Sequence, residues 1–153
     1  MQPGCNYRLP SEAEWEFAAR QRGQEIRFGD GTGRANPTNI NFSSKNLPGR
    51  STEQAGIERE KTVPIFDLKA NSLGLFNMSG NVFEWVMDRW HDDYENAPTD
   101  GAAWLDGTDS RRVIKGGSWD MEPYQNYNRD AKNANKGDDE VGFRLVSEAA
   151  CGE

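Results

Sequence analysis

A chain of 153 residues is long enough for one domain with a single, modest hydrophobic core. The net charge of −7 argues against a nucleic-acid-binding protein, because nucleic-acid affinity depends on many contacts from lysine and arginine to phosphates. Only 35% of the residues are hydrophobic, and no apolar run approaches the roughly 20 residues that a membrane-spanning helix needs.

The first predicted element is a helix that begins after Ser11. The Ser11 side chain can accept the backbone N–H of Glu14, and the Glu14 side chain can reach back to the backbone of Ser11, which is the pattern of a capping box. Trp15, Ala18 and Ala19 follow at helical spacing and form an apolar stripe. We expect this helix to end by Gly23.

The next predicted region is a long loop. Residues 28 to 61 are rich in Gly, Asn, Pro and charged residues and show no regular hydrophobic period. A loop of this length is unusual in a compact domain, and such loops are often functional or braced by a bound cation. Residues 62–66 follow as a predicted short strand.

Three more strands are predicted at residues 82–87, 111–115 and 141–146. The first of them alternates, so that Phe83, Trp85 and Met87 share one face and Glu84 lies on the other. A glutamate within such a strand is costly unless its carboxylate is paired or binds a metal ion. One helix, several short strands and long loops indicate an α+β fold with a small antiparallel sheet.

A polar segment lies between the last two predicted strands, at residues 120–135. It is rich in Asn, Asp and Tyr, and such residues are typical of adaptable binding surfaces, because Tyr supplies rigid amphipathic area and Asn supplies hydrogen bonds. The alternative is a solvated loop that binds nothing. The candidate ligand-binding residues are Asp120, Met121, Glu122, Tyr124, Gln125, Asn126, Tyr127, Asn128, Asp130, Asn133 and Asn135.

The cysteines and acidic residues leave several alternatives open. Cys5 and Cys151 lie near opposite ends of the chain and form no zinc-binding pattern, so they are either two separate thiols or a disulfide that joins the termini. The single histidine, His91, excludes a metal centre built from several histidines of this chain. The acidic runs at 91–95 and 137–140 are either solvated loops or cation sites.

Four motifs stand in order along the chain: YRLPSEAEWEFAAR at 7–20, NSLGLFNMSGNVFEW at 71–85, RVIKGGSW at 112–119 and GFR at 142–144. Together they resemble the formylglycine-generating enzyme family, also called the sulfatase-modifying factor family. The resemblance spans residues 7 to 146 and implies that residues 1–153 form a single domain with an elaborated C-type-lectin-like fold.

The resemblance also implies a difference from the family. Its domains usually carry a substantial N-terminal portion before the first of these motifs, and this chain lacks it. In this fold the first strand normally pairs with the last, and an unpaired edge strand would promote association. We therefore consider a fragment, a minimal version, or a chain whose sheet is completed by a partner chain or by self-association.

Calcium is the cofactor that the resemblance implies. The matching positions are Asn77, Gly80, Val82 and Glu84. Two side-chain oxygens and two backbone carbonyls form a hard-oxygen set that suits a structural calcium ion. A second site would use Asn39 and Ile40, although no acidic partner matches in the loop that follows them. The alternative for the first site is that Glu84 pairs with an arginine.

Copper is not expected. The family's enzymes oxidise a substrate cysteine to formylglycine with two cysteines that bind copper(I), and these cysteines correspond to Met121 and Asn126. Thiolates are the natural ligands of copper(I), and one methionine without a thiolate partner makes a poor copper site. Formylglycine formation is therefore not expected.

The sequence thus favours a non-catalytic module that presents residues 120–135 to a protein or another ligand. The segment also resembles, in composition, the variable region of proteins diversified by retroelements on the same scaffold. One alternative is an enzyme of the family with different oxidative or tailoring chemistry, for which Glu122, Arg129 and Asp130 are candidate polar groups. The other is an accessory subunit completed by a partner chain.

Overall fold

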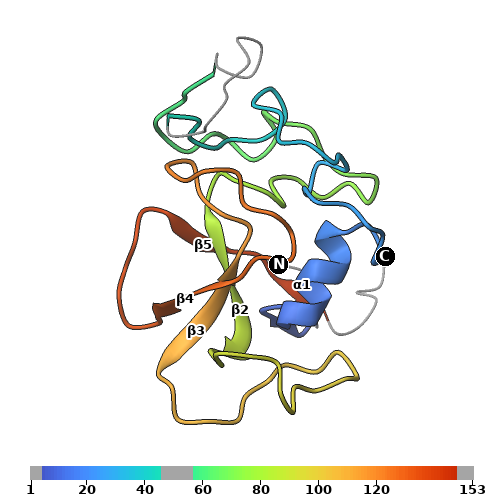
Figure 1. The fold of residues 1–153 in the computed structure, drawn as a ribbon, viewed down its shortest axis with the longest axis vertical. Coiled ribbons are helices and arrows are strands. Elements are labelled where there is room, and N and C mark those ends of the chain that lie inside the picture. The colour runs from blue at the N-terminus through green and yellow to red at the C-terminus, as the bar shows by residue number, and fades with distance from the viewer. Residues whose placement is uncertain (1–4, 46–56, 148–153) are drawn as a thin grey trace.

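The computed structural model describes residues 5–45 and 57–147. Its elements are β1 (Tyr7–Arg8), α1 (Glu12–Ala19), β2 (Phe83–Arg89), β3 (Arg111–Lys115), β4 (Asp130–Asn133), β5 (Val141–Phe143) and β6 (Val146–Ser147). Helix α1 lies beside the sheet, the long loops between α1 and β2 gather at one end of it, and the loop between β2 and β3 lies at the other end (Figure 1). The arrangement is α+β, as predicted.

The main sheet has the strand order β4-β3-β2-β5. The pairs β2–β3 and β3–β4 are antiparallel, whereas β2–β5 is parallel. The sheet is therefore mixed, and the predicted small antiparallel sheet is correct except for the parallel pair β2–β5. The reason is that the chain leaves β4 at one edge and crosses to the opposite edge before it forms β5, so β5 runs in the same direction as β4 and β2.

Helix α1 has the predicted capping box. The Ser11 hydroxyl accepts the Glu14 N–H at 3.1 Å, and the Glu14 carboxylate accepts the Ser11 N–H at 2.8 Å. Trp15 and Ala19 are buried, as the apolar stripe predicts, and they form a core cluster with Met78, Val86 and Val113. The hydrophobic core therefore lies between α1 and the face of β2 that carries Val86.

The loops before β2 contain a second apolar cluster, formed by Phe28, Ile40 and Phe42. Residues 62–66 are not a strand, contrary to the prediction. Both backbone groups of Val63 bond the side chain of Asn81 instead of a neighbouring strand, and Pro64 has no N–H to donate. The apolar composition of this stretch thus belongs to an ordered loop.

The predicted strand at 141–146 is divided into β5 and β6. β5 pairs with β2, whereas β6 pairs antiparallel with β1, so the first strand pairs with the last as the resemblance implied. Cys5, just before β1, is disulfide-bonded. Cys151 lies outside the described residues, and the pairing of these two cysteines stays a prediction.

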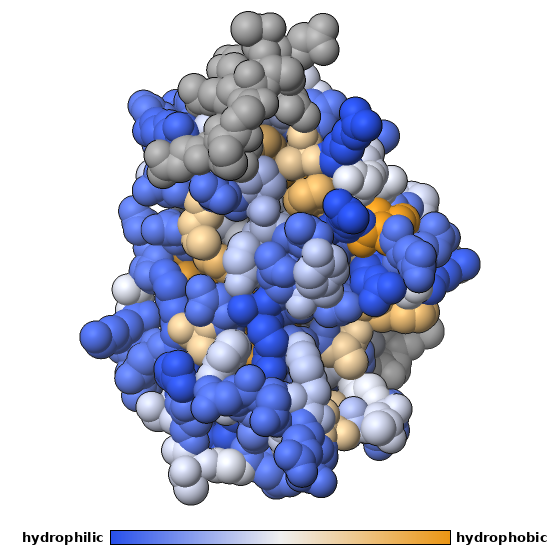
Figure 2. All heavy atoms as spheres, in the orientation of Figure 1, coloured by the Kyte–Doolittle hydropathy of each residue, from blue (hydrophilic) through white to orange (hydrophobic). Residues whose placement is uncertain are grey.

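The surface is mostly hydrophilic on the face that Figure 2 shows, and its hydrophobic residues form small, scattered groups. No helix among the described residues is long and apolar enough to cross a membrane.

Candidate functional site

The polar segment 120–135 begins with a close contact between Tyr124 and the Gly-Gly turn before it. A Cβ on Gly117 would lie 2.4 Å from the Tyr124 Cβ, so only glycine fits beneath this tyrosine. The Tyr124 ring packs edge-on against Phe83 at 5.2 Å between centroids, and burial raises the pKa of Tyr124 to about 12. Tyr124 therefore fixes the segment to β2 with one side of its ring.

Asn126 attaches the segment to the interior of the protein. Its side chain is 0% exposed, and it donates to the carbonyls of Ala19 at 3.4 Å and Ile26 at 3.0 Å. Its Oδ1 accepts the Ser79 hydroxyl at 3.3 Å, and its backbone N–H bonds Arg27. Asn126 was predicted to contact a ligand, but it cannot reach one, because it is the buried hydrogen-bonding centre that joins the segment to three other parts of the chain.

Arg129 is a third anchor. Its guanidinium pairs with Glu12 at 3.0 Å and donates to the His91 carbonyl at 3.1 Å. It also lies over the rings of Trp90 at 4.6 Å and Tyr94 at 4.5 Å. Sequence patterns gave no indication of this role, because the partners lie far away in the chain and only the fold brings them together.

A buried ionic network continues beneath the segment. Lys115 of β3 is 0% exposed, and its ammonium lies 3.1 Å from Glu16 and 3.6 Å from Glu12. The Tyr94 hydroxyl donates to Glu12 at 2.8 Å, and burial together with this bond raises the pKa of Tyr94. Helix α1, β3 and the segment are thus joined through charged groups that have partners.

The remaining residues of the segment face outward to different degrees. Tyr127 is 54% exposed, and its hydroxyl donates to Gln125. The predicted binding residues that are exposed are Asp120, Glu122, Tyr127, Asp130 and Asn135. Those that are partly exposed are Met121, Tyr124, Gln125, Asn128 and Asn133. The structure therefore separates the predicted set into outward-facing residues and the buried Asn126.

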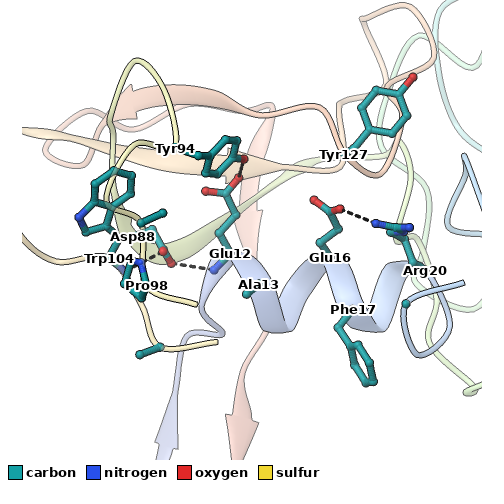
Figure 3. Close-up of a pocket in the computed structure, with 13 residues that line it drawn as sticks. Glu12, Ala13, Glu16, Phe17, Arg20, Asp88, Tyr94, Pro98, Trp104 and Tyr127 are labelled. Atoms are coloured by element: carbon teal, nitrogen blue, oxygen red, sulfur yellow. Dashed lines mark hydrogen bonds and ion pairs between the residues drawn. The ribbon is translucent and has the colours of Figure 1, made fainter. Parts of the chain in front are cut away.

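A groove of about 480 Å³ lies beside the segment, along the outer side of α1. Figure 3 shows Glu12 and Glu16 projecting from α1 toward Tyr94 and Tyr127, with Phe17 on the opposite side of the helix. Within the predicted set, only Tyr127 lines this groove. The sequence offers no indication of this groove, because one of its two walls comes from the loop after β2, far from α1 in the chain.

Only some of the predicted calcium ligands have an oxygen that is available to bind calcium. The Glu84 carboxylate accepts the Trp15 indole N–H at 2.6 Å and two N–H groups of Arg144 at 2.5 and 2.6 Å. Asn77 has a buried Oδ1 with no partner among the described residues. Asn77 can thus offer an oxygen, whereas Glu84 makes the arginine pair that was the alternative. Gly80 and Val82 lie between them, and calcium binding stays a prediction.

The second predicted calcium position lies at the apolar cluster of the loops. Ile40 is 2% exposed and belongs to that cluster. The Asn39 side chain donates to Asp30 at 3.0 Å, so an acid lies beside Asn39, but it precedes Asn39 in the chain. No acid of the loop that follows was matched by sequence, and the structure likewise leaves this site a prediction.

The acidic run at 137–140 places three carboxylates close together, from Asp138, Asp139 and Glu140. Asp138 pairs with Lys132, and Glu140 accepts the Ser118 hydroxyl at 2.5 Å. Two of the three carboxylates therefore have protein partners, which favours the interpretation as a solvated loop.

The family is decided by the match to a family model. Residues 3–149 match the model described as "Sulfatase-modifying factor enzyme 1-like domain". The chain belongs to this family. The resemblance that the four motifs indicated is therefore confirmed.

Named relatives agree with this assignment. The chain is 39% identical to the chaperone protein LppX of Paenibacillus barcinonensis over 76% of this chain and 40% of that protein. It is 34% identical to the formylglycine-generating enzyme of Streptomyces coelicolor over 93% of this chain and 47% of that enzyme. The chain thus spans less than half the length of either relative.

Two solved structures have the same fold. PvdO from Pseudomonas aeruginosa superposes with a TM-score of 0.77 at 31% identity, over 95% of this chain and 54% of PvdO. Variable protein 1 of Treponema denticola superposes with a TM-score of 0.73 at 28% identity, over 91% of this chain and 46% of that protein. These neighbours confirm the predicted C-type-lectin-like fold of the formylglycine-generating enzyme type.

Proposed function

We propose that this domain is a non-catalytic ligand-binding module that presents the outward-facing residues of segment 120–135 on a formylglycine-generating-enzyme-like scaffold. The observation that carries the proposal is the division within the segment. Tyr124, Asn126 and Arg129 attach it to the fold, while neighbouring positions expose polar and aromatic side chains. A rigid scaffold that holds an exposed segment is the usual arrangement for recognition.

The state of the copper positions supports a non-catalytic role. Asn126 occupies one of them, and its amide makes hydrogen bonds to Ala19, Ile26 and Ser79. Met121 occupies the other and supplies a thioether without a thiolate partner. Formylglycine formation by this chain would therefore need a different set of copper ligands.

The likeness to a variable protein supports a further part of the proposal. We infer that the exposed residues of the segment differ between natural copies of this gene and that a retroelement diversifies them. Asn codons changed at their adenines yield Asn, Tyr, Asp and Ser, and this mixture resembles the composition of the segment.

Sequencing the codons for residues 120–140 in a natural population tests this function. Substitutions are expected at Asp120, Glu122, Tyr127, Asp130 and Asn135, and Asn126 is expected to stay constant because a new side chain there would lose the buried bonds. The matched control is the loop at 91–110 of the same reads. A segment as constant as this loop would contradict the proposal and favour a fixed role, as an enzyme or as an accessory subunit.

A partner chain or self-association is a separate proposal. β5 is an edge strand of the main sheet, and its Phe143 is 65% exposed. An exposed edge with an apolar side chain can pair with another chain. Sedimentation velocity of the wild type and of Phe143→Lys tests this, since a dimer formed through β5 would dissociate in the variant, and a wild-type monomer would contradict it.

A further inference from the structure

Three exposed aromatic side chains rim the groove beside α1. Phe17 is 55% exposed, Tyr94 is 56% exposed and Tyr127 is 54% exposed, and they come from the helix, the loop after β2 and the polar segment. Exposing an aromatic ring to water is unfavourable, and three rings around one groove indicate a surface that is covered when a ligand binds. Of these three aromatic residues, only Tyr127 belongs to the surface that the proposed display function uses.

The groove is held open by the fold rather than by mobile side chains. The Asp88 carboxylate accepts the Glu12 N–H at 2.7 Å and the Trp104 N–H at 2.8 Å. One buried carboxylate therefore joins the start of α1 to the opposite wall. Small-molecule sites are usually preformed, mainly apolar and a few hundred Å³ in volume, and the groove's approximately 480 Å³ matches this description.

Glu16 is the acidic group of the lining that a ligand in the groove can reach. Glu12 is buried and already bonded to Tyr94 and Arg129. Glu16 has a side chain that is 22% exposed, with one oxygen 3.1 Å from the buried Lys115 and the other 3.1 Å from Arg20. The pair with Arg20 is an i,i+4 pair near the surface, and such pairs are weak. An incoming cation can thus replace Arg20 on this oxygen.

The surrounding charges favour a cationic ligand over an anionic one. The chain carries a net charge of −7. The groove is lined by the carboxylates of Glu12, Glu16 and Asp88 and by the guanidinium of Arg20. Acidic groups around a groove attract cations and repel anions. The aromatic face of Tyr127 also favours a nearby cation, whereas the Arg129 guanidinium already lies over the Tyr94 ring.

We propose that this groove binds a small amine or guanidine with an apolar body. The cation takes the Glu16 oxygen that Arg20 occupies in the free protein, and the apolar body lies over Ala13 toward Phe17 and Pro98. This site is distinct from the display surface of segment 120–135, with which it shares only Tyr127.

The test is a ligand-observed NMR titration of the whole chain with phenethylamine. Hydrocinnamate, which has a similar ring and chain but a carboxylate, serves as the charge control, and phenethyl alcohol serves as the neutral control. The amine is expected to saturate, and Phe17→Ala is expected to weaken it about tenfold through lost apolar contact. Glu16→Gln is expected to weaken it about fivefold through loss of the charge pair.

Arg20→Gln gives the most specific outcome. It removes the internal competitor for Glu16, so the amine is expected to bind about twofold more tightly. Glu122→Ala, a change in the display segment, leaves amine affinity unchanged, so failure here and failure of the display function are distinguishable. Equal binding of the alcohol or the carboxylate, or weaker amine binding by Arg20→Gln, would overturn the proposal. Circular dichroism checks that each variant is folded. Phe17→Ala and Arg20→Gln are expected to keep the fold, because both side chains are partly exposed.

Discussion

Residues 28–45 and the part of segment 120–135 that precedes β4 are both irregular, but different interactions hold these two regions to the fold. Residues 28–45 close over an apolar cluster of their own, formed by Phe28, Ile40 and Phe42. The segment is held from below by the buried amide of Asn126 and the ion pair of Arg129. The first region is therefore part of the core, whereas the second leaves its outer side chains available for recognition.

The largest effect is expected in the region with its own cluster. Phe42 is 3% exposed, and Phe42→Ala is expected to destabilise the fold by about 3 kcal/mol, because it removes a buried ring and leaves a cavity. Phe66→Ala is the control, since Phe66 is 78% exposed, and it should cost under about 1 kcal/mol. Chemical denaturation measures both values, and equal losses would show that the cluster adds no stability of its own.

The second effect concerns the segment's polar anchor. Asn126→Ala is expected to cost about 2 kcal/mol, because the buried Ala19 carbonyl, the partly buried Ile26 carbonyl and the Ser79 hydroxyl lose their partner. Asn128→Ala, two positions later and partly exposed, is the matched control and should stay within about 0.5 kcal/mol. Thermal unfolding measures the difference, and a neutral Asn126→Ala would mean that the segment has other anchors.

Calcium tests the loop that leads into β2. If the Asn77 oxygen, which has no partner among the described residues, helps to bind calcium, then calcium at about fivefold its Kd stabilises the fold by about 1 kcal/mol. Asn77→Gly removes the oxygen and suits the positive φ of 52° at this position. Asn96→Gly, at another positive φ, is the control. Melting curves with calcium and with a chelator decide the question, and an unchanged melting temperature in the wild type would exclude a stabilising calcium ion.

The smallest effect is a pH dependence at the start of α1. The hydrogen bond from Arg8 holds the pKa of Glu14 below its ordinary value of 4.5. Because the folded pKa is depressed, this stability is present above pH 4.5 and is lost as the pH falls through the lower folded value. Its size is under about 1 kcal/mol, since the Glu14 side chain is 39% exposed.

Glu14→Gln keeps the capping geometry and removes the titrating group, so it isolates this contribution. Unfolding free energies at about pH 6 and about pH 3 should differ less for Glu14→Gln than for the wild type. A larger pH dependence in the variant would contradict the assigned role of Arg8.

The elements that could be predicted from the sequence are those encoded by neighbouring residues. The capping box of Ser11 and Glu14 lies within four residues, and the alternation in β2 lies within seven. Residues 62–66 looked like a strand because composition does not reveal that Asn81 bonds the backbone of Val63. The family resemblance supplied the fold as a whole, because its four motifs are spaced along most of the chain.

The candidate site could be predicted only in outline. The composition of residues 120–135 indicated an exposed polar segment, but it did not separate Asn126 from its exposed neighbours. The partners of Asn126 and Arg129 lie about one hundred residues earlier in the chain, at Ala19 and Glu12. The sequence alone does not distinguish a buried asparagine from an exposed one. The groove also needed the structure, since α1 and the loop after β2 form it together.

The most direct test is a tolerance map of segment 120–135. Each position is replaced by all amino acids in a display library, and folded variants are recovered after protease treatment. We expect Asp120, Glu122, Tyr127 and Asp130 to accept most substitutions, and Tyr124, Asn126 and Arg129 to accept few. Exposed positions as sensitive as these three anchors would contradict the division of the segment into a fixed base and a free surface.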